Sequence, residues 1–439
     1  MTTSATSNRV LRAGLGGLLV TAVLLGAPRA GSGQLTVTLE EALQRALERS
    51  PAMAQQEQAV ESASSAQRQA LGTFLPSLSL SSGGSLRSTQ RFDQATDRIV
   101  EGSSDSYSAG LSSSITVFDG GRMFANLAGA QADYRAAEAR QGNQRNQVTL
   151  QTKSLFFAAL RQGDLTDVAR ERVRQAEESL TMVRTRTQVG TATVSDSLRA
   201  RLEFVNARQS LLQAETATRA ARFALGRQVG EAAPVTPVRP KDLEPTPLAL
   251  SEEAILVIAE SESPAVIAAV EGTLSAASGV RDARGQYLPS LRLSSGYSWA
   301  NQDPSFSGGT TSWNLNLSAS LPVFNGFARE GTLERAQFAH RVARLQEDDV
   351  RLAAREQADG ALQDVRTAEQ AIAIAEEALA VAEEDLRVIR ERYRVGVATI
   401  LELVTSQISL VQAGATAVTA RYDYVLARAQ LEAVLGRGL

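Results

Sequence analysis

The chain carries the same ordered set of local motifs twice, and this internal repeat limits the possible folds more than any other feature. Each half contains a Ser-Pro pair, a Leu-Pro-Ser-Leu motif, a Val-Phe-Asp/Asn-Gly motif and a Val-Gly turn. They lie at 50–51, 75–78, 117–120 and 189–190 in the first half and at 263–264, 288–291, 323–326 and 395–396 in the second. Chance does not place four motifs twice in one order. The sequence therefore predicts a tandem duplication of helix–strand–strand–helix–helix.

The boundaries of the two repeats follow from composition. The first repeat is expected at 34–230 and the second at 248–439, joined by an extended linker at 231–247 that contains five prolines. Runs of alternating apolar and polar residues predict two strands in each repeat, with polar surface loops between them. We expect strands at about 77–90, 107–118, 290–300 and 312–324, loops at 91–106 and 301–311, and helical hairpins with tips at about 187–196 and 393–402.

Heptad spacing predicts that the helical hairpins pack as coiled coils. Large residues lie seven apart in the second repeat, and small residues, mostly Ala, fill the second heptad position. The large residues are Val365, Ile372, Leu379, Leu386 and Tyr393, and the first repeat has a matching run at Val173, Ala176, Leu180, Val183 and Thr187. Gly190 and Gly396 follow these runs and can adopt the left-handed conformation that ends a helix.

The N-terminus and the composition indicate an exported protein. Residues 1–33 are typical of a secretory signal, because Arg9 and Arg12 precede a short apolar run that ends in small residues. The chain has no Cys and no later stretch that resembles a transmembrane helix, so membrane insertion would have to use β-strands. A net charge of −3 argues against a nucleic-acid partner.

An enzyme is not expected. The only His, His340, lies in a charged helical context that predicts a surface position. The sequence shows no metal-ligand spacing, no phosphate-binding glycine loop and no nucleophile–base pair. We therefore expect no catalytic residue, no metal and no cofactor, and we interpret Asp119 and Asn325 as helix caps rather than ligands.

The four predicted strands have the alternation of an outer-membrane barrel. One face carries Leu, Ile, Val, Trp and Tyr and the other carries Ser, Asn, Thr and Gly. Four strands cannot close a barrel, so two copies would give eight strands and three copies twelve with a pore. A soluble sandwich and a structural rod remain alternatives. Tyr107, Tyr297, Trp299 and Trp313 are interpreted as an interfacial girdle or as ordinary sheet packing.

Taken together, these motifs resemble the TolC-like outer membrane efflux proteins over essentially the whole mature chain. The resemblance implies a mainly α fold with a transmembrane β-barrel portion, in which a homotrimer forms a twelve-stranded barrel continuous with a twelve-helix periplasmic tunnel. It places the chain in the outer membrane, in contact with its lipid and extending into the periplasm. It implies a periplasmic adaptor and an inner-membrane pump or ABC exporter as partners, in a tripartite efflux or type I secretion system.

The resemblance also implies functional residues at the hairpin tips. Four positions match a polar periplasmic gate: Ser195, Asp196, Tyr393 and Glu402. The family's gate Arg and second acid are replaced by Ala398 and Thr405, which puts an Arg-locked closed state in doubt. Rings of carboxylates favour cations, although the two acids can also simply be helix-start residues. The adaptor is expected to contact the two tips at Val189, Gly190, Thr191, Val395, Gly396 and Val397.

A second class of function remains open at this point. A periplasmic coiled-coil adaptor or scaffold without a barrel would also use long helical hairpins. The paired strands in each repeat favour the export duct, because adaptors usually carry one hairpin flanked by small β-domains.

Overall fold

The computed structural model describes residues 35–438 except 96, 241–245, 247, 249 and 306. The expected secretory signal at 1–33 and part of the proline-rich linker lie outside the described residues. The elements, in chain order, are β1(Leu35–Val37), α1(Leu39–Arg49), α2(Pro51–Gly72), β2(Ser77–Asp93), β3(Arg98–Phe118), α3(Arg122–Gln188), α4(Val194–Gln228), β4(Val235–Pro237), α5(Glu252–Glu262), α6(Pro264–Gly285), β5(Ser290–Asn301), β6(Thr310–Ser320), α7(Ala328–Arg394) and α8(Ile400–Leu435).

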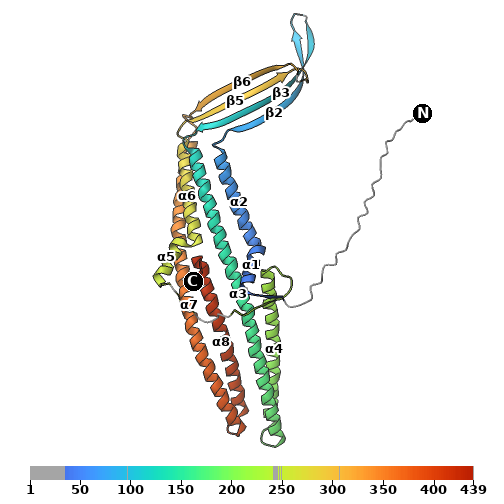
Figure 1. Cartoon of the computed structure of the whole chain (residues 1–439), viewed down its shortest axis with the longest axis vertical. Coiled ribbons are helices and arrows are strands. Elements are labelled where there is room, and N and C mark those ends of the chain that lie inside the picture. The colour runs from blue at the N-terminus through green and yellow to red at the C-terminus, as the bar shows by residue number, and fades with distance from the viewer. Residues whose placement is uncertain are drawn as a thin grey trace, which may run out of the picture. The chain divides into compact units, whose positions relative to one another are not determined.

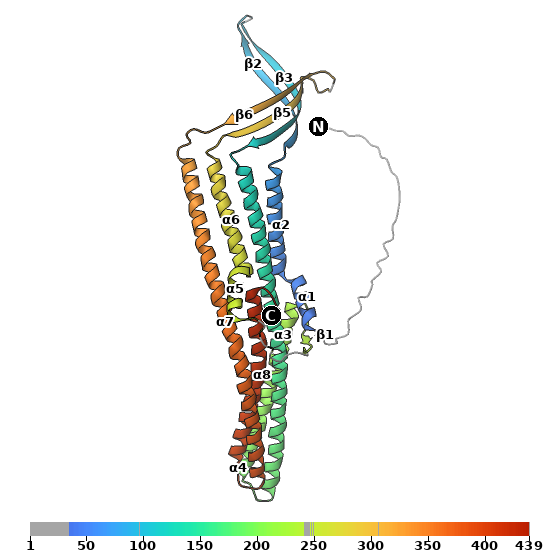
Figure 2. The same cartoon turned by 60° about the vertical axis from the view of Figure 1, so that its left-hand side comes forward.

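The described part from Leu35 onward is an elongated bundle of helices with a sheet beyond one end (Figure 1). The four-stranded sheet of β2, β3, β5 and β6 lies above the helices, and the turns that join α3 to α4 and α7 to α8 lie at the opposite end. The view in Figure 2 shows the same order, with the short helices α1 and α5 beside the middle of the bundle. Sheet and tips are therefore separated by the length of the long helices.

Side-chain caps set the starts of the helices. Ser50 and Ser263 accept hydrogen bonds from backbone amides three residues on, and each is followed by a proline in the first turn. Proline has no amide hydrogen to lose at that position, so both Ser-Pro pairs start helices as the sequence predicts. Neither α3 nor α7 has a side-chain cap at its N-cap residue, Gly121 or Phe327. Asp119 still accepts from the amide of Met123 in the first turn of α3, at 3.2 Å, whereas Asn325 does not cap α7.

The two long helices set the length of the bundle. α3 and α7 each contain 67 residues, so each extends about 100 Å at roughly 1.5 Å per residue. Each folds back through a tight turn into a shorter helix, α4 or α8. Gly190 and Gly396 have φ of 79° and 83° in these turns, a conformation that costs other residues free energy.

The predicted heptad positions form the buried seams of these hairpins. Val365, Ile372, Leu386 and Tyr393 of α7 are all less than a tenth exposed, and Leu379 is partly buried beside them. In α3, Ala176, Leu180 and Val183 are buried in the same way. Small residues such as Ala375 and Ala200 fill the places where helices come closest. The coiled-coil packing follows from the spacing of the sequence.

A second apolar cluster holds the middle of the molecule together. Phe156, Leu225 and Tyr422 come from α3, α4 and α8 and pack with Val37 and Val235. Val37 and Val235 belong to β1 and β4, which pair in parallel. Part of the predicted linker is thus an ordered strand that ties the start of one repeat to its end.

The larger sheet is antiparallel in the order β2-β3-β5-β6. The strand lengths differ from the sequence expectation. β2 continues to Asp93 and β3 begins at Arg98, so most of the expected loop at 91–106 is a hairpin extension. β6 ends at Ser320 rather than at 324, because Pro322 has no amide hydrogen to continue the ladder. Charged side chains do not prevent strand pairing, which depends on backbone groups.

Glycine allows a close contact where the sheet meets the helices. Gly120 has φ of 76°, and a Cβ atom there would lie 2.2 Å from the carbonyl oxygen of Gly285. The geometry of this turn therefore excludes any side chain at Gly120. The contact joins the end of β3 to the end of α6, so the two halves of the chain are locked together at the base of the sheet.

Core packing in the middle of the bundle is testable by truncation. Leu225 is completely buried, so Leu225→Ala is expected to lower the free energy of unfolding by about 2–5 kcal/mol. Gln213→Ala, on the exposed side of the same helix, is expected to change it by less than about 0.5 kcal/mol. Denaturant unfolding followed by far-ultraviolet circular dichroism measures both. Equal unfolding midpoints for the two variants would contradict this assignment of the core.

Candidate functional site

The tip of the first hairpin is built around a reciprocal cap. The backbone amide of Asp196 donates to the Thr193 hydroxyl at 3.1 Å, and the amide of Thr193 donates to the Asp196 carboxylate at 3.0 Å. Two amides at the start of α4 are thereby satisfied. Ser195, between them, is exposed. One wall of the tip thus presents a hydroxyl and a carboxylate that are held in place by local bonds.

The second hairpin repeats this device. The amide of Glu402 donates to the Thr399 hydroxyl at 3.2 Å, and both the amide and the hydroxyl of Thr399 donate to the Glu402 carboxylate, at 2.6 and 2.9 Å. These bonds, the backbone one first, lower the pKa of Glu402. The exposed carboxylate therefore keeps its negative charge at the start of α8. Thr405, where a second acid was expected by resemblance, is also exposed.

Tyr393 lies in a different setting from the two acids. Its side chain is only 4% exposed and packs in an apolar cluster with Leu386, Ile400 and Leu403. Burial raises the pKa of Tyr393, and the negative charge of Asp196 acts in the same direction. Within the described part of the chain the buried hydroxyl has no hydrogen-bond partner. The phenol is therefore neutral and belongs to the packed wall of the tip.

Arg186 joins the two tips. Its guanidinium donates to the backbone carbonyl of Tyr393, lies 4.9 Å from the centre of the Tyr393 ring, and donates to the carbonyl of Thr191 at 3.4 Å. Arg186 belongs to α3 and Tyr393 to α7, so a single side chain spans both hairpins. Cations over aromatic faces and charge-assisted hydrogen bonds are both favourable.

The sheet at the other end has two chemically distinct faces. One cross-strand row consists of Leu80, Leu111, Tyr297 and Trp313, and the neighbouring rows of that face mix apolar residues with Ser and Thr. The opposite face carries hydroxyls that pair across strands: Ser77 with Ser114, Ser79 with Ser112, and Ser298 with Ser312, at 3.0, 2.8 and 2.8 Å. Trp313 is 77% exposed, so the apolar face is uncovered in the single chain.

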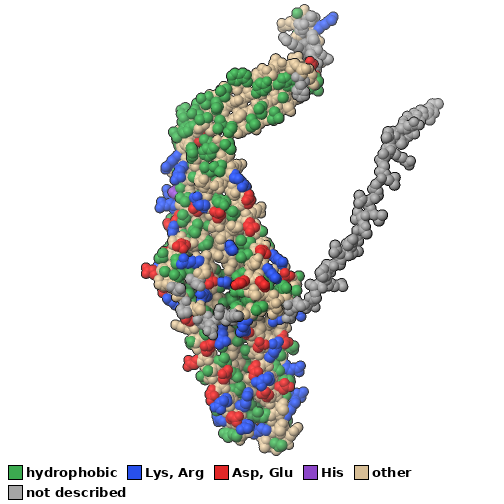
Figure 3. All heavy atoms as spheres, viewed as in Figure 1, with side chains coloured by type: hydrophobic (Ala, Val, Ile, Leu, Met, Phe, Trp, Pro, Cys, Tyr) green, Lys and Arg blue, Asp and Glu red, His purple; other side chains and the backbone are tan. Residues whose placement is uncertain are grey.

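The surface as a whole follows this division. Hydrophobic side chains gather over the sheet and its junction with the helices, whereas acidic and basic side chains cover the helical part (Figure 3). Exposed apolar residues at the junction include Leu75, Val323, Phe324 and Phe327. An exposed apolar area of this extent marks a surface that contacts lipid or another protein.

Comparison with known proteins identifies the family. The model of the outer membrane efflux protein family matches residues 42–231 and 255–437. The chain belongs to the outer membrane efflux protein family. It is a TolC-like channel protein of the outer membrane that extends into the periplasm.

Individual relatives agree with this assignment. The chain is 30% identical to Protein CyaE of Bordetella pertussis over 405 residues, which cover 90% of this chain and 81% of the relative. It is 24% identical to the outer membrane protein TolC of Vibrio cholerae over 378 residues, covering 83% and 82%. A membrane protein from Pseudomonas aeruginosa shares the fold with a TM-score of 0.80 at 20% identity, covering 90% and 93%.

Membership in this family separates the hypotheses that the sequence left open. A soluble sandwich, a structural rod and a periplasmic adaptor or scaffold without a barrel are all set aside, because the outer membrane efflux family model matches both repeats, including both strand pairs. No described helix combines the length and the apolar composition that crossing a membrane requires. Among the described residues, no three His, Cys, Asp or Glu side chains gather in a way that could hold a metal ion.

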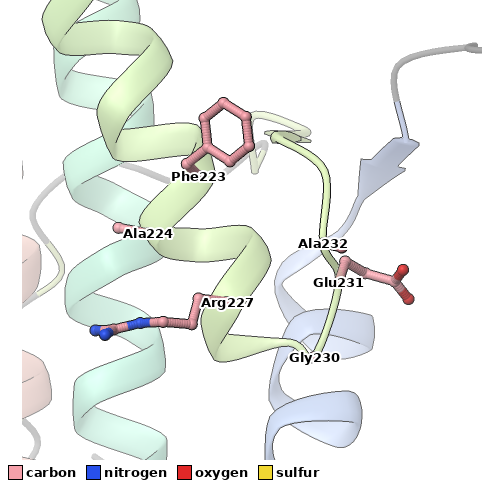
Figure 4. Close-up of a pocket in the computed structure, with 6 residues that line it drawn as sticks. All are labelled: Phe223, Ala224, Arg227, Gly230, Glu231 and Ala232. Carbon is pink, nitrogen blue, oxygen red and sulfur yellow. The ribbon is translucent and has the colours of Figure 1, made fainter.

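The hollow at the end of α4 offers no second site. It is lined by Phe223, Ala224, Arg227, Gly230, Glu231 and Ala232. Figure 4 shows that Arg227 and Glu231 point away from one another. Glu231 instead forms an ion pair with Arg49 at 3.0 Å. The polar side chains that line this hollow do not converge on a common point.

Sequence reasoning found the acids and the tyrosine of the tips but missed Arg186. The arginine is one of many on the helix faces, and its contact with Tyr393 spans 207 residues of sequence. Ala398, where the family's gate Arg was expected by resemblance, is buried in the same apolar cluster. In this channel the arginine beside the tyrosine comes from the other hairpin.

Arg186 is expected to restrict the motion of the tips relative to each other. The chain has no Cys, so Val189→Cys and Val395→Cys provide unique spin-label sites on the two exposed tips. Adding Arg186→Gln is expected to broaden the label-to-label distance distribution, because the bonds to Tyr393 and Thr191 are lost. Arg184→Gln, an exposed neighbour on α3, is the control and should leave the distribution unchanged. Identical distributions in both backgrounds would rule out the proposed restraint.

Proposed function

We propose that three copies of this chain form one exit duct, with a closed twelve-stranded barrel in the outer membrane and a twelve-helix tunnel in the periplasm. The duct receives substrates from a periplasmic adaptor and an inner-membrane pump or ABC exporter, as part of a tripartite efflux or type I secretion system. The observation that carries the proposal is the four-stranded sheet with two chemically opposite faces and two outer strands, β2 and β6.

The edges of this sheet support oligomerisation. A strand edge in hydrocarbon leaves backbone amides and carbonyls without partners, at several kcal/mol each. Pairing β6 of one copy with β2 of the next satisfies these groups. Three copies bring twelve strands, which is enough to leave a pore, whereas eight strands leave only room for side chains. The apolar face then contacts lipid, with Tyr107, Tyr297, Trp299 and Trp313 towards its outer half, and the hydroxyl face lines the lumen.

The helices support the same assembly. One face of α7 carries exposed apolar residues seven positions apart: Ile374, Val381 and Val388. They are exposed because they face away from the buried seam at Ile372. α4 has a similar exposed stripe, in heptad-like spacing, at Leu198, Leu202, Val205 and Leu212. Regular apolar stripes that have no partner in a single copy are the expected contacts between helices of neighbouring copies.

The two halves of the chain support a tunnel of similar units. Helices at corresponding places in the two repeats have equal lengths: 11 residues in α1 and α5, 22 in α2 and α6, and 67 in α3 and α7. We interpret them as two copies of one ancestral unit, so that three chains provide six similar hairpins around the axis.

The tips are proposed as the periplasmic gate and as the docking point for the adaptor. Ser195, Asp196 and Glu402 would face the narrow end of the lumen, while Tyr393 and Arg186 hold the wall behind them. The exposed turn residues provide the adaptor contact. These are Val189, Gly190, Thr191, Val395, Gly396 and Val397, with the three valines each more than 60% exposed.

Assembly and conductance test the proposed duct. The purified protein is expected to migrate as a trimer on unheated gels and to produce stable conductance steps in planar bilayers. Leu202→Glu with Leu212→Glu should reduce both, because charges in an apolar seam are costly to bury. Asn206→Glu, which adds one such charge at an exposed position beside the stripe, is the control for each single substitution, Leu202→Glu and Leu212→Glu. Recovery of the wild-type chain as a soluble periplasmic monomer would disprove the proposal.

Ion selectivity tests the gate. Asp196→Asn with Glu402→Gln removes both charges but keeps oxygen acceptors for the reciprocal caps. Cation preference, measured from reversal potentials in a salt gradient, is expected to weaken, because two rings of three carboxylates are lost. Since the pKa of Glu402 is lowered, the wild-type preference should persist to a pH below the one at which an ordinary glutamate takes up its proton, and should be lost only at more acidic pH. Selectivity unchanged by the double substitution would leave both acids as caps only.

A further inference from the structure

The four-stranded part of the sheet is almost free of charge. Its sections are 77–84 of β2, 107–118 of β3, 290–301 of β5 and 310–320 of β6, and the structure describes every residue in them. Arg292 is the one charged residue among them. An isolated arginine in a wall built from Ser, Asn, Thr, Gly and apolar residues requires an explanation.

The register places Arg292 on the hydroxyl face. Arg292 pairs with Thr116 on one side and Ser318 on the other, in a row parallel to Ser114, Ser294 and Asn316. Its Nη2 donates to the Ser114 hydroxyl at 3.1 Å. That bond occupies one of five N–H donors, so most of the exposed guanidinium remains available to solvent or solute.

The nearby arginines at the base of the sheet have structural partners. Arg122 forms an ion pair with Asp282 at 3.0 Å, and Arg329 donates to the carbonyls of Pro322 and Val323 at 2.8 and 3.1 Å. Within the part of the chain that the structure describes, Arg292 forms no ion pair, and no carboxylate lies in the four strand sections around it. Its positive charge is therefore not neutralised inside the sheet.

We propose that Arg292 is the anion-attracting position of the barrel lumen, an inference that rests on the trimeric duct proposed above. In the closed barrel the hydroxyl face lines the lumen, and threefold symmetry brings three guanidiniums to one level near the helical end of the barrel. Arginine stays protonated at any working pH, and rings of arginine in pores favour anions. The ring attracts small anions and the carboxylate or phosphate groups of passing substrates.

The position of this ring gives the duct two charged levels of opposite sign. The tips at the periplasmic end carry Asp196 and Glu402, and the base of the barrel carries Arg292, about 100 Å away along the long helices. That separation is many times the Debye length of about 8 Å at physiological salt, so each level acts on solutes independently. A substrate meets the negative level first and the positive level last.

Three variants separate this role from a structural one. Arg292→Gln removes the charge but keeps a donor for Ser114, and Arg292→Lys keeps the charge while it removes the planar guanidinium. Ser318→Glu leaves Arg292 in place and sets a carboxylate beside it. Arg87→Gln is the matched control, because Arg87 lies past Gly84, where β3 no longer pairs with β5.

Reversal potentials of the full-length protein in planar bilayers under a potassium chloride gradient provide the measurement. At about 0.1 M salt, Arg292→Gln and Ser318→Glu are expected to lower the anion-to-cation permeability ratio by on the order of threefold, and at 1 M salt the difference should shrink. Arg292→Lys and Arg87→Gln should keep the wild-type ratio.

The outcomes distinguish the inference from the proposed duct. If the wild-type protein forms no pores, the duct fails and this inference fails with it. If pores of normal conductance form but Arg292→Gln or Ser318→Glu keeps the wild-type ratio at low salt, the duct stands and the role of Arg292 is overturned. Should Arg292→Gln not assemble into the trimer seen on unheated gels, Ser318→Glu decides the question alone.

Discussion

The backbone of the four-stranded sheet imposes the constraint on which the rest of the structure depends. Every amide and carbonyl in an apolar environment needs a hydrogen-bond partner, and the outer strands β2 and β6 have one edge each that the single chain does not pair. The apolar row that includes Leu111 and Trp313 is likewise uncovered. In the proposed trimer, the edges of these strands would meet those of other copies and the apolar face would meet lipid.

The long helices connect the sheet to the hairpin tips. The sheet is joined to the helices by a contact too close for any side chain at Gly120, which holds the end of β3 against the end of α6. The long helices α3 and α7 then run to the tips, where Arg186 ties one hairpin to the other through Tyr393. The same two helices therefore link the sheet to the hairpin tips.

The hairpin tips and the hydroxyl face of the sheet carry a few charged groups among mostly neutral residues. Asp196 and Glu402 are each held in place by a reciprocal cap at the start of a helix. Arg292 is held by one hydroxyl and remains largely exposed. In the proposed duct, charges in such settings act on passing solutes rather than on the stability of the fold, because water screens them from the rest of the protein.

Interactions between residues close in the chain were determined by the sequence itself. The Ser-Pro helix starts, the heptad seam through Ile372 and Leu386, and the alternation of β6 all depend on local spacing. The polar composition of 91–106 wrongly predicted a loop, because strand pairing depends on backbone hydrogen bonds that most residue types can make. At 321–324 the apolar composition wrongly predicted a strand, because Pro322 has no amide hydrogen to continue the ladder. Only the tertiary structure decided that Arg186 contacts Tyr393, since that contact joins residues 207 apart and has no local pattern. It likewise decided the register that places Arg292 on the hydroxyl face, because a shift of one residue reverses the face of every side chain.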